Sequence, residues 1–205
     1  MRLARVVLIW AVLAAAIGVP IALSLTSELL EWRGFIYIAA GLAGMIALGL
    51  TLIQPLLIAG ALPGLSGYRG RRVHHWTGGA LVVTVLVHVG GLWITSPPDM
   101  IDALTYTSPT PFSPWGVTAM WAIFAVALLA FFRRRLALRT WRFVHMSLAV
   151  VIVGGSVAHA MLVEGTMETI SKAALCALVV VAAIKVIADL MQRKIRPMRS
   201  SSDGL

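Results

Sequence analysis

All five histidines of this 205-residue chain lie in two apolar stretches, and their spacing is the pattern from which a chemistry can be inferred. His74, His75 and His88 belong to the first stretch, and His145 and His159 belong to the second. His74 and His88 are 14 residues apart, and so are His145 and His159. Fourteen residues make just under four turns of an α-helix, so each such pair shares one helix face at a separation of ~21 Å.

An imidazole within hydrocarbon is costly unless it has a partner or a task, so membrane histidines are candidates for function. If the two helices face each other, His74 meets His145 at one level and His88 meets His159 at another. A metal held between two imidazoles on facing helices suits haem iron, whereas zinc prefers four ligands close together. We therefore expect these four histidines to be axial ligands of haem b, with two haems bound and a single haem as the alternative.

The fifth histidine and three arginines lie beside the inner pair. His75 is rotated away from the face of His88, so we expect it to contact a haem propionate, to shuttle a proton or to replace His74 as the ligand. Arginine pairs well with carboxylates, so Arg71, Arg72 and Arg142 are candidate propionate contacts. Anchoring at the membrane surface is the simpler explanation for most arginines of this chain. At the opposite end the only cations available are Arg33 and Lys172.

Glycine pairs accompany the histidines at residues 78–79, 90–91 and 154–155. Small residues let a large planar ligand approach the helix backbone, or let two helices pack closely. Both interpretations of these glycines stay open at this point.

The elements that must hold these residues are membrane-spanning helices. Hydrophobic residues make up 60% of the chain and charged residues 12%, with a mean hydropathy of +0.92. About 20 apolar residues cross the ~30 Å of hydrocarbon in a bilayer. Six such spans are predicted, at Val6–Leu25, Gly34–Ala61, Val73–Ile94, Trp115–Phe132, Trp141–Val163 and Ile170–Leu190.

The expected fold class is an all-α membrane protein, a six-transmembrane-helix bundle with both termini cytoplasmic. We expect one haem domain over residues 1–190 and a basic tail over residues 191–205, with disorder in Ser200–Leu205. The second span is longer than a crossing requires and contains Pro55, so it should tilt or end near that proline. Five prolines between residues 96 and 114 disfavour regular helix there, except for one turn at 99–104.

Charge predicts the orientation of the bundle. Of the 17 basic residues, 14 lie at the N-terminus, in the second and fourth loops and in the tail, and six of the eight acids lie on the opposite side. Cytoplasmic loops carry an excess of Lys and Arg, so both termini should lie in the cytoplasm of a bacterial inner membrane. The net charge of +9 is therefore explained by contact with membrane lipid and not with nucleic acid. The single cysteine, Cys176, excludes an internal disulfide and a C-x-x-C-H site for covalent haem.

Two segments resemble a known family. Residues 71–78 (Arg-Arg-Val-His-His-Trp-Thr-Gly), followed by His88, resemble the third helix of ferric reductase-like transmembrane domains. Residues 141–145 (Trp-Arg-Phe-Val-His), followed by His159, resemble the fifth helix of that family. The family includes eukaryotic ferric reductases, NADPH oxidases and the haem-binding membrane subunit of the periplasmic methionine sulfoxide reductase system.

The resemblance implies a six-helix bundle whose b haems move single electrons across the membrane, with His74 and His145 at the inner haem and His88 and His159 at the outer one. Arg often stands at the position of His75 in this family, which favours His74 as the ligand.

The sequence leaves three hypotheses for function. The first is a ferric reductase-like protein, the electron-transfer component of an oxidoreductase, that reduces an outer-face acceptor such as ferric iron. The second is a haem subunit that docks a separate periplasmic oxidoreductase. The third is a non-redox transporter or scaffold in which the histidines form a proton path. No G-x-G-x-x-G motif follows a strand pattern and no flavin site is expected, so the electron donor should be a separate flavoprotein or quinol.

Overall fold

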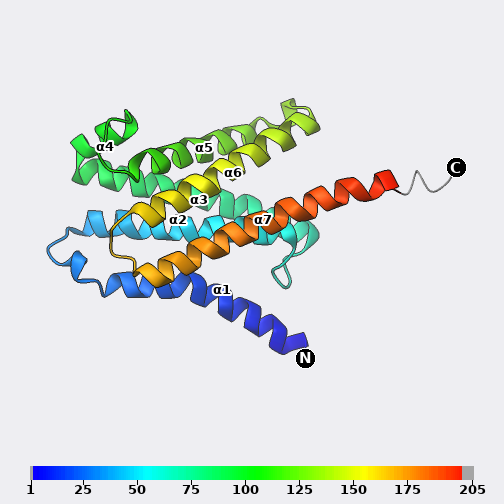
Figure 1. Cartoon of the computed structure of the whole chain (residues 1–205), viewed down its shortest axis with the longest axis horizontal. Helices are drawn as coiled ribbons and strands as arrows, with labels where there is room; N and C mark the ends of the chain where they lie inside the picture. Colours follow the sequence, from blue (N-terminus) through cyan, green and yellow to red (C-terminus); the bar gives the residue numbers. More distant parts are fainter. Residues whose placement is uncertain (1, 200–205) are drawn as a thin grey trace.

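The computed structural model describes residues 2–199, with the side chains of residues 3–192, and all the regular secondary structure in this part of the chain is helical (Figure 1). In chain order the helices are α1 (Arg2–Leu25), α2 (Phe35–Ala59), α3 (Gly67–Thr95), α4 (Pro97–Leu104), α5 (Ser113–Phe131), α6 (Leu138–Leu162) and α7 (Thr169–Arg199), with short 3₁₀ turns at Glu28–Leu30 and Arg133–Arg135. Within the described residues six helices, all except α4, are long and apolar enough to cross a membrane. The predicted all-helical class with six spans is confirmed.

Two spans are longer than hydropathy predicts. Helix α3 begins at Gly67, six residues before the expected Val73, and α7 continues beyond Leu190 to Arg199. The apolar criterion marks only the part of a helix that lies in hydrocarbon, whereas backbone hydrogen bonding continues through the polar residues beyond it. The expected disorder of Ser200–Leu205 lies outside the described residues.

The second span ends close to Pro55, which is one of the two outcomes expected for it, although the helix does not stop at the proline itself. Helix α2 passes through Pro55 and ends at Ala59, where Gly60 caps it in the left-handed conformation with φ 66°. Neighbouring helices can support a proline inside a membrane helix, so the missing N–H need not end it. Glycine adopts the left-handed conformation without steric cost, which explains the stop one turn later.

The proline-rich connection is more helical than expected. Helix α4 spans eight residues and starts at Pro97 and Pro98, whereas the sequence predicts a single turn. Proline is well tolerated in the first turn of a helix because the N–H groups there have no intrahelical acceptor. Met100 and Ala103 are the buried residues of α4, so this short helix covers the end of the bundle with its apolar side.

The six spans associate mainly as two antiparallel pairs, α2 with α3 and α5 with α6, and α7 packs against α1, α2 and α6 (Figure 1). One cluster of buried apolar side chains lies mainly among α1, α2 and α7. A second lies mainly among α3, α5 and α6, with Ala47 of α2 and Ala103 of α4. Within the described chain α3 and α6 are not among the helix pairs whose backbones pack closely. The two histidine-bearing helices are therefore held by their neighbours and leave room between them.

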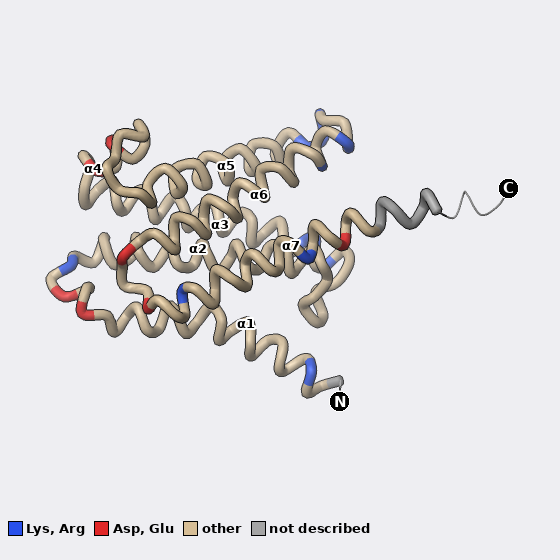
Figure 2. Tube along the Cα trace, viewed as in Figure 1, with Lys and Arg blue, Asp and Glu red and all other residues tan. Residues whose placement is uncertain are grey.

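Charged residues separate to the two ends of the bundle (Figure 2). The start of α1 and the described end of α7 lie at one end, together with the α2–α3 connection, the arginines in the first turns of α3 and the arginine-rich α5–α6 connection. This end is called the arginine-rich end. The connections α1–α2, α3–α5 and α6–α7 lie at the other end and carry most of the acids. Between the ends, large apolar side chains such as Val83, Phe131 and Val181 are exposed, as expected for a surface that faces lipid tails.

Candidate functional site

The four histidines with matched spacing meet in two pairs across the gap between α3 and α6. The ring centroids of His74 and His145 are 6.3 Å apart, and those of His88 and His159 are 6.4 Å apart. Each helix contributes one imidazole to each level, as the equal spacing predicts. The pair nearer the arginine-rich end is called the inner pair, and the pair nearer the acidic end the outer pair.

Both distances fit one metal ion between two imidazoles. With metal–nitrogen bonds of about 2 Å on either side, the two ring centroids would be roughly 6 Å apart. Edge-to-face aromatic contacts also have centroid distances of about 4.5–7 Å, so the distance alone does not distinguish ligation from packing. The partners of the ring nitrogens give further evidence.

Each outer imidazole is held by a backbone carbonyl. His88 Nδ1 lies 2.8 Å from the carbonyl oxygen of Ala40 in α2, and His159 Nδ1 lies 3.0 Å from that of Phe112, just before α5. A carbonyl oxygen can only accept, so both Nδ1 atoms must donate a proton. Nε2 then carries the free lone pair, which is the arrangement typical of a metal-binding histidine.

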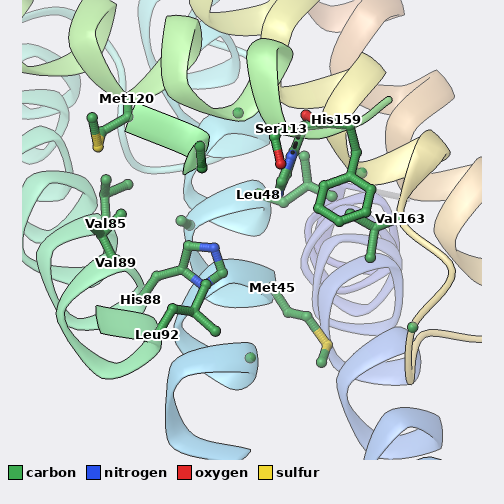
Figure 3. A pocket seen from close by; sticks show the side chains of 18 of the residues that line it. Met45, Leu48, Val85, His88, Val89, Leu92, Ser113, Met120, His159 and Val163 are labelled. Carbon is green, nitrogen blue, oxygen red and sulfur yellow. Dashed lines mark hydrogen bonds between the residues drawn. The ribbon is translucent and has the colours of Figure 1, made fainter. Parts of the chain in front are cut away.

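The outer pair also lines a large cavity. The cavity has a volume of about 660 Å³, and both rings project into it (Figure 3). Met45, Val85 and Met120 are among its apolar lining residues. Its volume falls within the range of about 300–1,000 Å³ that is usual for cofactor and ligand sites. A planar apolar cofactor with a metal centre therefore fits both the lining and the donor set.

Two cations also line this cavity. Lys172 is only 6% exposed, and its Nζ donates to the carbonyl oxygen of Val163 over 2.8 Å. The guanidinium of Arg33 lies 4.7 Å from the ring centroid of Tyr37. A buried ammonium with a neutral acceptor alone is costly, so the part of the cavity beside Lys172 favours a negative group on a ligand. The carboxylates of Asp99, Asp102 and Glu164 also line the cavity.

The inner pair has a different environment. Three buried nitrogens have no hydrogen-bond partner within the described residues: His74 Nδ1, His145 Nδ1 and Trp141 Nε1. The ring of Trp141 stacks on His145 at 5.0 Å with 15° between the planes, and the Arg133 guanidinium lies 5.0 Å from the Trp141 ring centroid. Buried polar atoms are nearly always paired, so three unpaired nitrogens in one place are consistent with a site built for a ligand.

The remaining predicted residues lie at the inner end but outside the pair. His75 is exposed, and its ring centroid lies 6.3 Å from that of Trp76. The ring that faces His145 is that of His74. Arg71, Arg72 and Arg142 are exposed, and none of them forms an ion pair with a described residue.

The glycines flanking the histidines mostly serve helix packing or face open space. A Cβ on Gly91 would lie 2.7 Å from Ala40 Cβ, and one on Gly155 would lie 2.9 Å from the Trp115 carbonyl oxygen. No neighbouring atom lies within 4 Å of a Cβ placed on Gly79, Gly90 or Gly154.

Two glycines that the sequence analysis missed lie against the outer imidazoles. A Cβ on Gly44 would lie 2.9 Å from His88 Nδ1, and one on Gly116 would lie 2.5 Å from His159 Nδ1. Trp141 was missed as well, although its position one turn before His145 is a signal that could have found it. No local pattern singles out Gly44 or Gly116, because their neighbours belong to distant parts of the chain.

Comparison with known proteins identifies the family. Residues 40–156, more than half of the chain, match the family described as ferric reductase like transmembrane component. The matched region contains four of the five histidines and ends three residues before His159. Comparisons with curated proteins and with solved structures gave no match. The match confirms the resemblance seen in the sequence: the chain belongs to the family of ferric reductase-like transmembrane components, which are multi-pass proteins of membrane electron transfer.

Proposed function

We propose that this chain is a di-haem cytochrome b of the membrane, the electron-transfer component of a ferric reductase-like oxidoreductase. It would carry single electrons from a cytoplasmic or quinol donor to an acceptor at the outer face, such as ferric iron. The observation that carries the proposal is the pair of imidazole levels, with centroid distances of 6.3 and 6.4 Å, in a chain of this family.

The four paired histidines are the proposed ligands, His74 and His145 for the inner haem and His88 and His159 for the outer one. Haem iron held by two histidines at each level would supply one-electron redox chemistry. The backbone carbonyls of Ala40 and Phe112 hold the outer rings so that Nε2 is available to bind. These two hydrogen bonds restrict rotation about the side-chain torsions of His88 and His159 before a ligand binds.

Other side chains contribute charge and shape. Lys172, at one end of the outer cavity, would pair with a haem carboxylate, with Arg33 as a second cation. Trp141 holds the His145 ring in a fixed plane by stacking on it. Arg71, Arg72 and Arg142 remain candidate contacts for the carboxylates of the inner haem. Apolar residues of the outer cavity such as Met45, Val85 and Met120 would surround the haem and shield it from water.

The direction of transfer follows from charge. The arginine-rich end is proposed to face the cytoplasm of a bacterial inner membrane, which supports an inner-to-outer path. A separate flavoprotein or a quinol would supply the electrons. At the outer end Asp99, Asp102 and Glu164 line the cavity. Carboxylates there would attract ferric ions.

The same carboxylates are also the observation that favours the second candidate, docking of a separate periplasmic oxidoreductase. A soluble partner that co-purifies with the chain and accepts its electrons would support that candidate over direct reduction of iron.

A spectrum of the purified protein tests the haem proposal. Dithionite reduction should produce a b-type α-band, and haem quantification should give two haems per chain. His88→Ala and His159→Ala should each remove the same haem, His145→Ala should remove the other, and His75→Ala should retain both. Absence of an α-band would contradict the haem proposal and leave a transporter or scaffold. Identical haem loss in all three ligand variants would favour a single site.

A further inference from the structure

The two outer imidazoles rest on helix backbones in the same way, although they come from different helix pairs. His88 contacts α2 through the carbonyl of Ala40, and four residues further on is Gly44. His159 contacts the start of α5 through the carbonyl of Phe112, and four residues further on is Gly116. The arrangement of a carbonyl at one position and a glycine four positions later therefore occurs twice.

This spacing has a geometric reason. In an α-helix the carbonyl oxygen of residue i points along the axis toward the N–H of residue i+4. The Gly116 N–H indeed donates to the Phe112 carbonyl oxygen over 3.2 Å, and the His159 ring shares that oxygen. A ring that reaches such an oxygen from outside must lie over residue i+4. A Cβ there would be 2.9 Å from His88 Nδ1 or 2.5 Å from His159 Nδ1, so any other residue at either position would force the ring to move.

The inner level lacks this arrangement. The two levels are 14 residues apart, and α2 runs antiparallel to α3. The position in α2 that corresponds to Ala40 at the inner level is therefore Gln54, and the residue four positions later is Ile58. In α5 the corresponding positions are Val126 and Ala130. Neither later position is a glycine. The backbone of Gln54 lies near the His74 ring, but neither inner Nδ1 atom forms a hydrogen bond of acceptable geometry with the described residues.

We propose that Gly44 and Gly116 are positioning residues that hold the outer imidazoles on backbone carbonyls and so make the outer redox site different from the inner one. The proposal rests on the proposed function, in which these imidazoles bind haem iron. A histidine that donates its second N–H to an acceptor is a more basic ligand, which favours oxidised iron and lowers the midpoint potential. Gly44 and Gly116 thus tune the potential of the outer level alone.

Alanine substitution tests this in the full-length protein with haem bound. Gly44→Ala and Gly116→Ala should weaken haem retention at the outer level by roughly tenfold or more, as other changes around metal-binding histidines do. In protein that retains both haems, the outer midpoint potential should shift positive and the inner one should stay unchanged. Redox titration followed by haem-resolved spectra measures both.

Two matched controls separate positioning from crowding. A Cβ on Gly49, also in α2, would lie 2.8 Å from an Ile17 methyl group, and its three nearest neighbouring atoms all belong to Ile17, so Gly49→Ala reports crowding of that helix alone. Gly18→Ala adds a methyl group where no neighbour lies within 4 Å. Outer-level changes in the Gly44 and Gly116 variants but not in these controls support the proposal. Wild-type behaviour of both variants, or equal shifts at both levels, overturns it.

The wild-type protein gives a second measurement that needs no variant. Electron–nuclear double resonance of the oxidised haems should detect strongly hydrogen-bonded Nδ1 protons at the outer level only. Equal signals from both levels would overturn the proposal even if an alanine variant failed to accumulate. A wild-type protein without haem would instead contradict the proposed function, so the two failures are distinguishable.

Discussion

Substitution of Lys172 should have opposite effects on the haem-free and the haem-loaded protein. Lys172 is 6% exposed, and its Nζ has the carbonyl oxygen of Val163 as its acceptor at 2.8 Å. The one ion pair within the described residues joins Lys185 and Asp189, so no carboxylate of that part forms an ion pair with Lys172. Lys172 also lies in the first turn of α7, where the helix dipole disfavours a positive charge. In the haem-free protein Lys172→Met should therefore stabilise the fold.

With haem bound, the same ammonium is expected to bind one of its carboxylates. Hydrogen bonds to charged groups contribute about 1.5–3 kcal/mol. A loss of about 2 kcal/mol corresponds to roughly 30-fold weaker binding, because about 1.36 kcal/mol is a factor of ten. Lys172→Met should thus release the outer haem about 30-fold faster, while Lys172→Arg should retain most of the interaction.

Haem transfer to an excess of a soluble haem-binding protein measures these release rates, and thermal unfolding in detergent measures the stability of each form. Lys185→Met is the matched control, because Lys185 is exposed and pairs with Asp189 at 2.8 Å. If Lys172→Met released haem at the same rate as the wild type and the Lys185→Met control, the reasoning that the outer cavity holds an anionic group would be refuted.

Three further predictions concern other parts of the bundle. Trp141→Leu should broaden or shift the spectrum of the inner haem alone, whereas Trp141→Phe, which keeps a ring against His145, should preserve it; low-temperature optical spectra measure this. Gly91→Ala should lower the stability measured by thermal unfolding by about 1–3 kcal/mol, because the added methyl group crowds the α2–α3 contact. Gly90→Ala adds its methyl group in open space and should leave the stability unchanged. Hydrogen bonds from the backbone N–H groups of Ile170 and Ser171 lower the pKa of Glu168. The wild-type protein should therefore be more stable than Glu168→Gln above the ordinary carboxyl pKa, and this difference should disappear as the pH falls through the lowered pKa of Glu168. Thermal unfolding of both proteins across acidic pH measures the difference.

The spans and the facing of the histidines were predictable because both depend on local properties. Hydrophobicity over about 20 residues defines a crossing, and the helical repeat alone puts His74 and His88 on one face. Helix ends were less predictable. Helix α3 starts at Gly67 because backbone hydrogen bonding continues where hydropathy has already fallen. Helix α4 was underestimated because proline disfavours a helix only beyond its first turn.

The surroundings of the histidines could not be read from the sequence, since they depend on which helices become neighbours. Gly44 precedes His88 by 44 residues, and the carbonyl that holds His159 belongs to a residue 47 positions away. The glycine pairs next to the histidines in the sequence looked more relevant, yet Gly91 packs against Ala40. The roles of the four histidines as haem ligands stay predictions until the spectra are measured.

The 14-residue spacing between the two levels has an electrical consequence. It separates them by ~21 Å along each helix, which is about 70% of the ~30 Å hydrocarbon thickness. Moving one charge through a membrane potential of 100 mV changes its energy by about 2.3 kcal/mol, so one electron passing between the levels would exchange about 1.6 kcal/mol with the field. In the proposed direction the electron moves toward the positive side. Turnover would therefore be driven by the membrane potential and would discharge it, and a compensating flow of ions would have to accompany sustained reduction at the outer face.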